Sequence, residues 1–148
     1  MKDIKGFEGL YAVTEDGRIW AYPKITAGKY ANRNIHGMWM KGINHSGYVY
    51  VCLYKNGKCT RKFIHRLVLE AFMPNPENKP FCNHKDCNTT NNHIDNLEWC
   101  TNKENIIHAY KNGLIHVTEK MRENSRYWGK KNNHFAIEAK RNIIKKEI

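Results

Sequence analysis

The sequence lacks long apolar runs. No stretch approaches the roughly 20 apolar residues of a membrane-spanning helix, and the N-terminal MKDIKGFEG has no signal-peptide core. We therefore expect a cytoplasmic protein with no membrane partner. The mean hydropathy is −0.76 and 41% of the residues are hydrophobic, which indicates a polar chain whose apolar segments are short.

Paired cysteines of the zinc-binding kind are also missing. The five cysteines are an odd number, and no two of them form a C-x-x-C knuckle. We therefore expect reduced cysteines that pack against other residues, and we do not expect a disulfide framework. Structural Zn²⁺ is not expected either, although Cys82, Cys87 and Cys100 would be its candidate ligands.

Acidic residues are few. Asp and Glu number 14 against 25 Lys and Arg, which gives a formal net charge of +11 at pH 7. The basic excess is spread along the chain and is not confined to one tail. It favours a polyanionic partner, nucleic acid first and an anionic membrane second, over simple solubility, which would need far less charge.

Short β-prone runs occupy the first half of the chain. LYAV and RIWAY flank TEDG, whose Asp-Gly predicts a tight hairpin. Residues 25–47 are rich in small and polar residues and are expected to form a loop or irregular segment. GYVYVCLY, KNGK and CTRKFIHR (47–66) then predict a second hairpin with a type I′ turn at Asn-Gly.

The second half predicts the order helix, strand, polar loop, strand, helix. HRLVLEAFM (65–73) has helical spacing and is followed by two prolines. KPFCNH and NLEWCT are short strands on either side of NHKDCNTTNN (83–92). The segment 101–113 begins with the capping box of Thr101 and Glu104 and ends at Gly113. A basic helix is expected near the C-terminus, within 138–148.

Polar side chains at the ends of these elements predict a small site. His84 ends one strand, Asn96 opens the next, and Asn105 lies in the first turns of the following helix. Packing of the hairpin against the helix would bring them together with Asn83. Histidine can take a proton from water at neutral pH, and Mg²⁺ accepts amide carbonyl oxygens. The set therefore suits phosphodiester hydrolysis.

The same residues carry a family resemblance. NHKDCNTTNNHIDNLEWCTNKEN resembles the HNH motif of phage and intron-encoded homing endonucleases, and HRLVLEAFMPNPENKPFCNHKD matches its lead-in. KDIKGFEGLYAVTEDGRIWA resembles the modular DNA-binding motif that often precedes this nuclease motif. The resemblance implies an α+β fold in three parts. These are an N-terminal antiparallel β DNA-binding module (1–46), a ββα-metal nuclease domain (47–113) and a basic C-terminal tail that contacts DNA (114–148).

The resemblance also implies roles for the site residues. His84 would be the general base, and Asn96 would clamp the loop by hydrogen bonds without touching the metal. Asn83 and Asn105 would bind Mg²⁺, for which Mn²⁺ can substitute. Nuclease members of the family place Asp where this chain has Asn83, and an amide lacks the charge of a carboxylate, so weaker metal binding is expected. The nearest carboxylate is Asp86, for which stabilising the loop is the favoured role over helping the metal.

Double-stranded DNA is the implied partner, bound by a monomer or weak dimer. Basic residues and one histidine are its candidate contacts: Lys85, His108, Arg18, Lys24, Arg122, Arg126, Lys130 and Lys131. For Lys85 a solvated loop charge is an equal alternative. For His108 a solvent-facing position is favoured over a contact with phosphate or metal. A structural role or a backbone contact is expected for His65, and core positions are expected for Phe81 and Trp99.

The predicted function is a metal-dependent DNA endonuclease of the HNH homing type that cuts one strand per active site. The alternative is a non-catalytic DNA-binding protein derived from such a nuclease, which Asn83 favours and the intact His84 opposes. A zinc-stabilised regulator is a third possibility, with the cysteines as its candidate ligands.

Overall fold

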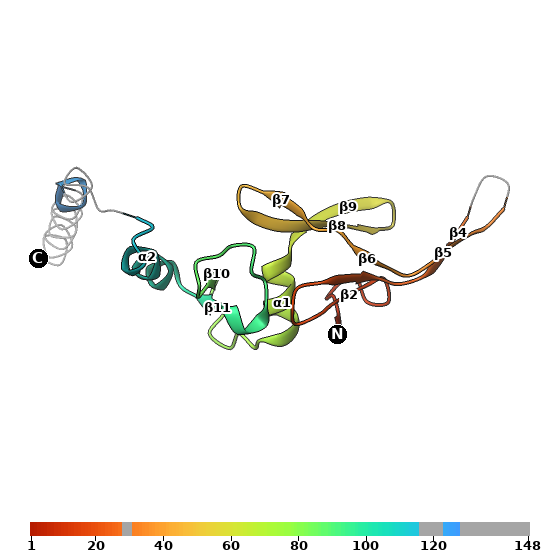
Figure 1. Cartoon of the computed structure of the whole chain (residues 1–148), viewed down its shortest axis with the longest axis horizontal. Coiled ribbons are helices and arrows are strands. Elements are labelled where there is room, and N and C mark those ends of the chain that lie inside the picture. Colours follow the sequence, from red (N-terminus) through yellow and green to blue (C-terminus); the bar gives the residue numbers. More distant parts are fainter. Residues whose placement is uncertain (28–30, 116–122, 128–148) are drawn as a thin grey trace, which may run out of the picture. The chain divides into compact units, whose positions relative to one another are not determined.

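The computed structural model describes residues 1–27, 31–115 and 123–127. The chain divides into two compact units, Met1–Ala109 and Tyr110–Ile148. The first unit contains all the strands of the described residues, together with helix α1 and most of helix α2 (Figure 1).

In the second unit, residues 123–127 are helical and exposed, and Arg126 is among them. Three other basic residues of the expected DNA-contacting tail, Arg122, Lys130 and Lys131, lie outside the described residues. So does the basic helix expected within 138–148.

A four-stranded antiparallel sheet forms the N-terminal part of the first unit. Its strand order is β1-β2-β3-β6, and the bounds are Lys2–Asp3, Tyr11–Val13, Ile19–Ala21 and Met38–Met40. The hairpin of β2 and β3 confirms the first predicted turn. Gly17 in that turn has φ +80°, and a Cβ there would lie 2.9 Å from the Cβ of Asn92. The turn therefore needs glycine both for its conformation and for its close approach to the polar loop.

The segment 25–47 is not irregular, so that expectation is wrong. It contains most of β4 (Lys24–Thr26) and all of β5 (Arg33–Ile35), β6 and β7 (Ile43–His45). Strands β4 and β5 pair with each other, whereas β6 pairs with β3 and β7 with β8. Each strand has only three residues and is mostly exposed, so the local sequence carries little alternation of apolar and polar residues.

The second predicted hairpin is confirmed as β8 (Tyr48–Lys55) and β9 (Lys58–Phe63). Asn56 and Gly57 have φ +52° and +76°, the two positive values that a type I′ turn requires. With β7 the hairpin forms a three-stranded sheet in the order β7-β8-β9. Val51 and Leu53 are buried in the core, as the two-residue period of a strand places them on one face.

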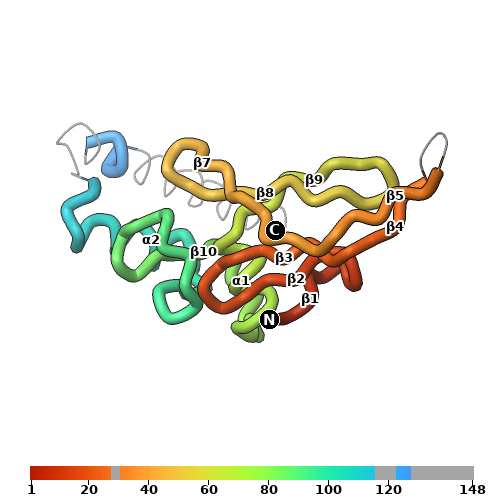
Figure 2. The backbone as a smooth tube through the Cα atoms, turned by 45° about the vertical axis from the view of Figure 1, so that its right-hand side comes forward, coloured from red at the N-terminus to blue at the C-terminus, as the bar shows by residue number. Residues whose placement is uncertain are grey.

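Helix α1 (Ile64–Phe72) joins three of the sheets of the first unit. It contacts β1 and β2, β8 and β9, and β10 and β11, and both ribbon and tube views place it between the N-terminal strands and β10 (Figure 2). Its fully buried Val68 and Leu69 belong to one apolar cluster with Val51, Leu53 and Leu97. Burial of each such side chain contributes about 2 kcal/mol, so α1 fixes the strands that hold the polar loop.

The last part of the first unit is a strand pair followed by a helix. Strands β10 (Phe81–His84) and β11 (Leu97–Cys100) are antiparallel, and a 3₁₀ turn, η1 (Ile94–Asn96), precedes β11. Helix α2 (Asn102–Lys111) follows.

One of the two predicted core positions in this pair is wrong. Phe81 is 40% exposed, whereas Trp99 packs against the core. The described elements are mostly strands with few helices, which confirms the α+β prediction. Within the described ranges, no helix has the length and apolar character needed to cross a membrane.

Candidate active site

The end of β10 places two polar side chains in a buried position. Asn83 and His84 are only 6% and 4% exposed. In the antiparallel register Asn83 stands opposite Glu98, and His84 stands opposite Leu97. The strand pair therefore fixes the backbone of both polar residues, while the loop after His84 decides what surrounds them.

That loop is held from within by Asn96. Its side-chain Nδ2 donates to Asp86 Oδ1 and to the Asn91 carbonyl, both at 2.9 Å, and its Oδ1 accepts from the Asp86 amide at 3.0 Å. The Asn96 carbonyl accepts from the Lys85 amide at 2.8 Å. One amide side chain thus closes the loop across ten positions of sequence.

Asp86 is the other centre of the loop. Its Oδ1 also accepts from the Asn88 amide at 2.8 Å, and its Oδ2 accepts from Asn91 Nδ2 at 2.7 Å. These hydrogen bonds, that of Asn91 first, lower the pKa of the Asp86 carboxyl. Both carboxylate oxygens are engaged inside the loop, so Asp86 has a structural role in this geometry.

The N-terminal module supports the same loop. The Ile94 amide donates to the Glu15 carbonyl at 2.8 Å, and Gly17 of the β2–β3 turn lies against Asn92. The loop is therefore braced by a turn about 75 residues earlier in the chain, a contact that local sequence patterns do not predict.

Asn92 faces the imidazole of His84. Its Nδ2 donates to the Thr90 carbonyl at 3.1 Å, which turns its Oδ1 toward His84 Nε2 at 3.5 Å. An amide oxygen only accepts, so Nε2 carries the hydrogen and Nδ1 keeps the free lone pair. Burial lowers the pKa of His84, against smaller opposing effects of Asn92 and Asp86. A neutral imidazole with one defined basic nitrogen is what a general base requires.

Aromatic rings enclose His84 on its other side. The rings of His65 and His84 meet edge to face with centroids 5.2 Å apart, and Tyr48 lies 5.4 Å from His65 and 6.1 Å from His84. Phe63 stacks on His65 at 5.4 Å. His65 is 6% exposed, and its buried Nδ1 has no hydrogen-bond partner in the described part of the chain. Burial, with repulsion from His84 and Arg66, lowers the pKa of His65 to about 4.

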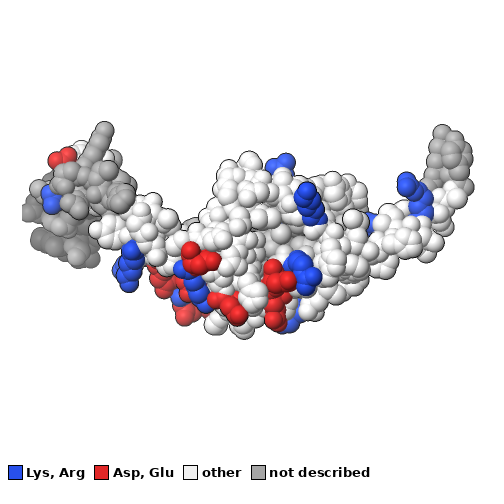
Figure 3. Space-filling model, in the orientation of Figure 1, with Lys and Arg blue, Asp and Glu red and all other residues white. Residues whose placement is uncertain are grey.

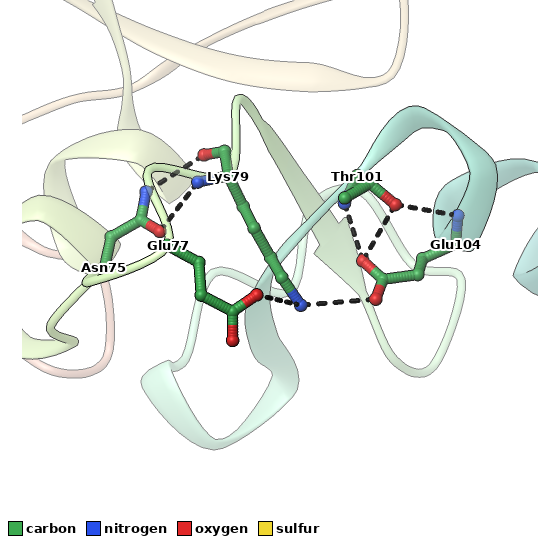
Figure 4. A network of polar contacts seen from close by, with 5 residues as sticks. All are labelled: Asn75, Glu77, Lys79, Thr101 and Glu104. Atoms are coloured by element: carbon green, nitrogen blue, oxygen red, sulfur yellow. Dashed lines mark hydrogen bonds and ion pairs between the residues drawn. The ribbon is translucent and has the colours of Figure 1, made fainter.

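Helix α2, which carries Asn105, is anchored at its start by the predicted capping box. The Thr101 amide donates to Glu104 Oε2 at 2.7 Å, and the Glu104 amide donates to Thr101 Oγ1 at 3.2 Å. Lys79, held by Asn75 in the loop before β10, binds Glu104 Oε1 at 3.2 Å (Figure 4). Asn105 is half-buried, and its amide donates to the Thr101 carbonyl at 3.0 Å.

Hydrogen bonds of His108 join α2 to the loop itself. His108 Nε2 lies 3.1 Å from the Lys85 carbonyl, and its Nδ1 lies 3.9 Å from Cys87 Sγ. Because the carbonyl only accepts, Nε2 is the donor and Nδ1 accepts from the thiol. Lys85 Nζ donates to the Asp95 carbonyl at 2.9 Å. Both candidate DNA contacts of this region therefore make bonds across the loop.

The two predicted ligands, Asn83 and Asn105, suit a hard cation better than zinc by their chemistry. Asn83 and Asn105 offer amide carbonyl oxygens, which Mg²⁺ and Mn²⁺ accept. Among the described residues there is no group of three or more His, Cys, Asp and Glu that could hold a metal ion. Burial raises the pKa of Cys82 to about 12 and also raises that of Cys100.

The candidate DNA contacts of the N-terminal module are exposed. Lys24 lies on β4, and Arg18 binds Asp16 at 2.7 Å while its guanidinium covers the Trp39 ring at 4.6 Å. No acidic residue occurs between Asp16 and Glu70. On the face shown in Figure 3, Lys and Arg but no Asp or Glu appear over the β7-β8-β9 sheet. This part of the surface suits a polyanion.

Comparison with known proteins identifies the class. The chain matches the HNH endonuclease family over residues 62–106 and the NUMOD4 motif over residues 2–54. The first range contains the β10–β11 pair and the first half of α2, and the second contains the N-terminal strands. The chain therefore contains an HNH endonuclease domain and an N-terminal NUMOD4 motif.

Individual relatives come from phages and viruses. DNA endonuclease I-HmuI of Bacillus phage SP01 is 34% identical over 118 residues, which is 80% of this chain and 62% of that protein. An HNH endonuclease of Acanthamoeba polyphaga mimivirus is 40% identical over 101 residues, 68% of this chain and 27% of that protein. The chain thus spans less than two thirds of the length of either relative.

A solved structure shares the fold. It is described as DNA binding and cleavage by the HNH homing endonuclease I-HmuI, and it superposes with a TM-score of 0.59 at 28% identity. The match covers 84% of this chain and 65% of that chain.

Proposed function

We propose that this protein is a metal-dependent DNA endonuclease of the homing type that hydrolyses one strand per active site. The observation that carries the proposal is the arrangement of His84, buried beside Asn92 with Nδ1 as its basic nitrogen. The homology to HNH homing endonucleases supports it, since the relative I-HmuI is named as a DNA endonuclease.

In the proposed reaction His84 Nδ1 takes a proton from the attacking water, which approaches phosphorus in line with the leaving 3′ oxygen. A divalent cation at the oxygens of Asn83 and Asn105, Mg²⁺ with Mn²⁺ as a substitute, would supply positive charge beside the phosphate. Asn96 keeps the loop closed so that His84 is held in one orientation. Asn92 fixes which nitrogen is basic.

We further propose that the chain binds double-stranded DNA as a monomer or weak dimer, in the cytoplasm of a bacterial or phage-infected cell. Exposed basic residues such as Lys24, Arg18 and Arg126 would contact phosphates, which provides affinity without sequence information. A single general base supports cutting of one strand at a time, so a double-strand break requires two successive events or two copies.

A supercoiled-plasmid assay tests the proposal. Wild-type protein should convert supercoiled plasmid to the nicked form with Mg²⁺ or Mn²⁺ and not with EDTA. His84→Ala should lower the rate by at least about 100-fold, the usual contribution of a general base. The exposed His36→Ala is the matched control and should cut like wild type. Cleavage that survives His84→Ala contradicts the mechanism.

The second candidate function is DNA binding without catalysis, which the neutral Asn83 favours. It predicts tight DNA binding by wild-type protein with no nicking in either metal. An electrophoretic mobility shift beside the plasmid assay separates the two functions.

A further inference from the structure

The amide of Asn83 has a carboxylate partner. Asn83 Nδ2 donates to Glu98 Oε1 at 2.8 Å. The two residues stand directly opposite each other in the register of β10 and β11, so their side chains project from the same face of the strand pair. Asn83 is 6% exposed and Glu98 is half-buried. The hydrogen bond between Asn83 and Glu98 is therefore held in place by two paired strands.

The contact decides which end of the Asn83 amide faces the site. A carboxylate accepts hydrogen bonds and does not donate them, so the NH₂ group of Asn83 must face Glu98. The carbonyl Oδ1 is then turned away from Glu98 and is the end left for a cation. Without Glu98 the amide could rotate by half a turn and present its NH₂ group, which repels a cation.

The contact also brings a negative charge next to the ligand. Hydrogen bonds to an ionised acceptor are shorter and roughly twice as strong as those between neutral groups. A carboxylate at the NH₂ end draws positive charge toward itself and leaves the carbonyl oxygen more negative. Partners of this kind, one bond removed from a metal, are known to raise the basicity of its ligands.

We propose that Glu98 is a positioning residue of the metal site, one that orients Asn83 and supplies through it the negative charge that the amide lacks. The pair Asn83 and Glu98 then acts as one unit in place of a single carboxylate ligand. The inference rests on the proposed function, since it takes Asn83 as a ligand of the cation.

The test measures metal binding directly. Mn²⁺ is titrated by electron paramagnetic resonance against full-length protein, alone and with a short DNA duplex, in the His84→Ala background so that no DNA is cut. Glu98→Gln keeps the shape and an acceptor oxygen but removes the charge, and it should weaken Mn²⁺ binding by about tenfold. Glu70→Gln removes the same charge from the exposed face of α1 and should change the affinity less than twofold.

The decisive variant exchanges the two groups. Asn83→Asp combined with Glu98→Gln keeps a hydrogen bond with donor and acceptor reversed and moves the charge onto the ligand. It should bind Mn²⁺ at least as tightly as wild type. Equal affinities of wild type and Glu98→Gln, or a double variant no tighter than Glu98→Gln, would overturn the proposal.

Failure of the proposed function has a different signature. Asn83→Ala and Asn105→Ala should each weaken Mn²⁺ binding by more than Glu98→Gln does. If neither changes it, the metal site itself is wrong, whereas losses in both with none in Glu98→Gln contradict only the role of Glu98. Circular dichroism and thermal unfolding of every variant show that the compared proteins are folded.

Discussion

Two regions of the molecule use charge in opposite ways. Residues 17–69 contain ten Lys and Arg and no acidic residue, whereas residues 81–111 contain four acidic residues and three lysines. In the second region the acids have internal partners: Asp86 holds the loop, Glu98 holds Asn83, and Glu104 caps α2. The first region has no acidic residue of its own to pair with its cations, whereas the second uses its anions to shape a small site.

The largest effect is expected at Asn96, because the loop of the second region depends on this one side chain. Asn96→Ala removes three hydrogen bonds, two of them with Asp86. At about 1 kcal/mol per bond, the free energy of unfolding should fall by about 3 kcal/mol, and nicking should fall about 100-fold because His84 loses its fixed position. Urea unfolding and the plasmid assay measure these effects.

Asn34→Ala, exposed on β5 in the acid-free region, is the control for Asn96. A surface change of this kind should alter the unfolding free energy by less than about 0.5 kcal/mol. Equal losses in the two variants would show that the loop is no more dependent on its amide than an exposed strand is.

Acid should weaken the protein at the boundary between the two regions. The pKa of His65 is about 4 in the folded state, against about 6.5 in an unfolded chain. Between these values the unfolded state binds a proton that the folded state does not, so stability is constant above pH 6.5 and falls as pH drops toward 4. The loss should be about 2–3 kcal/mol, and the lowered pKa of His84 acts in the same direction.

Urea unfolding of wild type and His65→Phe from pH 7.5 to about 4 checks this linkage. Phenylalanine suits the ring cluster with Phe63 and Tyr48 and does not titrate. The variant should lose less stability than wild type over this range. Parallel curves for the two proteins would rule out His65 as the source.

His108 offers a smaller test, within the second region. His108→Ala should raise the Mg²⁺ concentration for half-maximal nicking by about tenfold, since His108 fastens to the loop the helix that carries the proposed ligand Asn105. His108→Gln can still donate to the Lys85 carbonyl and should recover most of the loss. A rate defect that excess Mg²⁺ does not relieve would place His108 outside metal binding.

The smallest effect is expected for a single cation of the first region. Lys24→Ala should lower DNA affinity a few-fold and reduce the slope of log affinity against log salt by about 1. Lys103→Ala, next to Glu104 on α2, should leave the slope unchanged. Fluorescence anisotropy with labelled duplex at several salt concentrations measures both. Identical salt-dependence slopes for the two variants would show that the lysines of the two regions do not differ in their contact with DNA.

Local patterns predicted the elements that carry their own signals. The Asn56–Gly57 turn, the apolar face of α1 and the capping box of Thr101 and Glu104 each depend on residues close in sequence. Local patterns did not predict the strands within 25–47, because β6 and β7 are defined by pairing with β3 and β8.

The candidate site likewise has features that the sequence predicts and features that only the fold reveals. Asn83, His84, Asn96 and Asn105 stand out in the sequence because the family motif contains them. The partners that define their chemistry do not. Glu98 meets Asn83 only through the strand register, and His65 reaches His84 only through the packing of α1. The sequence therefore predicts which residues are candidate ligands, whereas the partners that orient them depend on the fold.

Helix α2 has no fully buried side chain, in contrast to α1 with five buried residues. Polar fastenings at Thr101, Lys79 and His108 hold it to the rest of the first unit. Local opening of such an element costs far less than global unfolding, so its amide hydrogens should exchange with solvent well before those of α1. Opening of α2 would therefore displace Asn105 while the core around α1 stays folded.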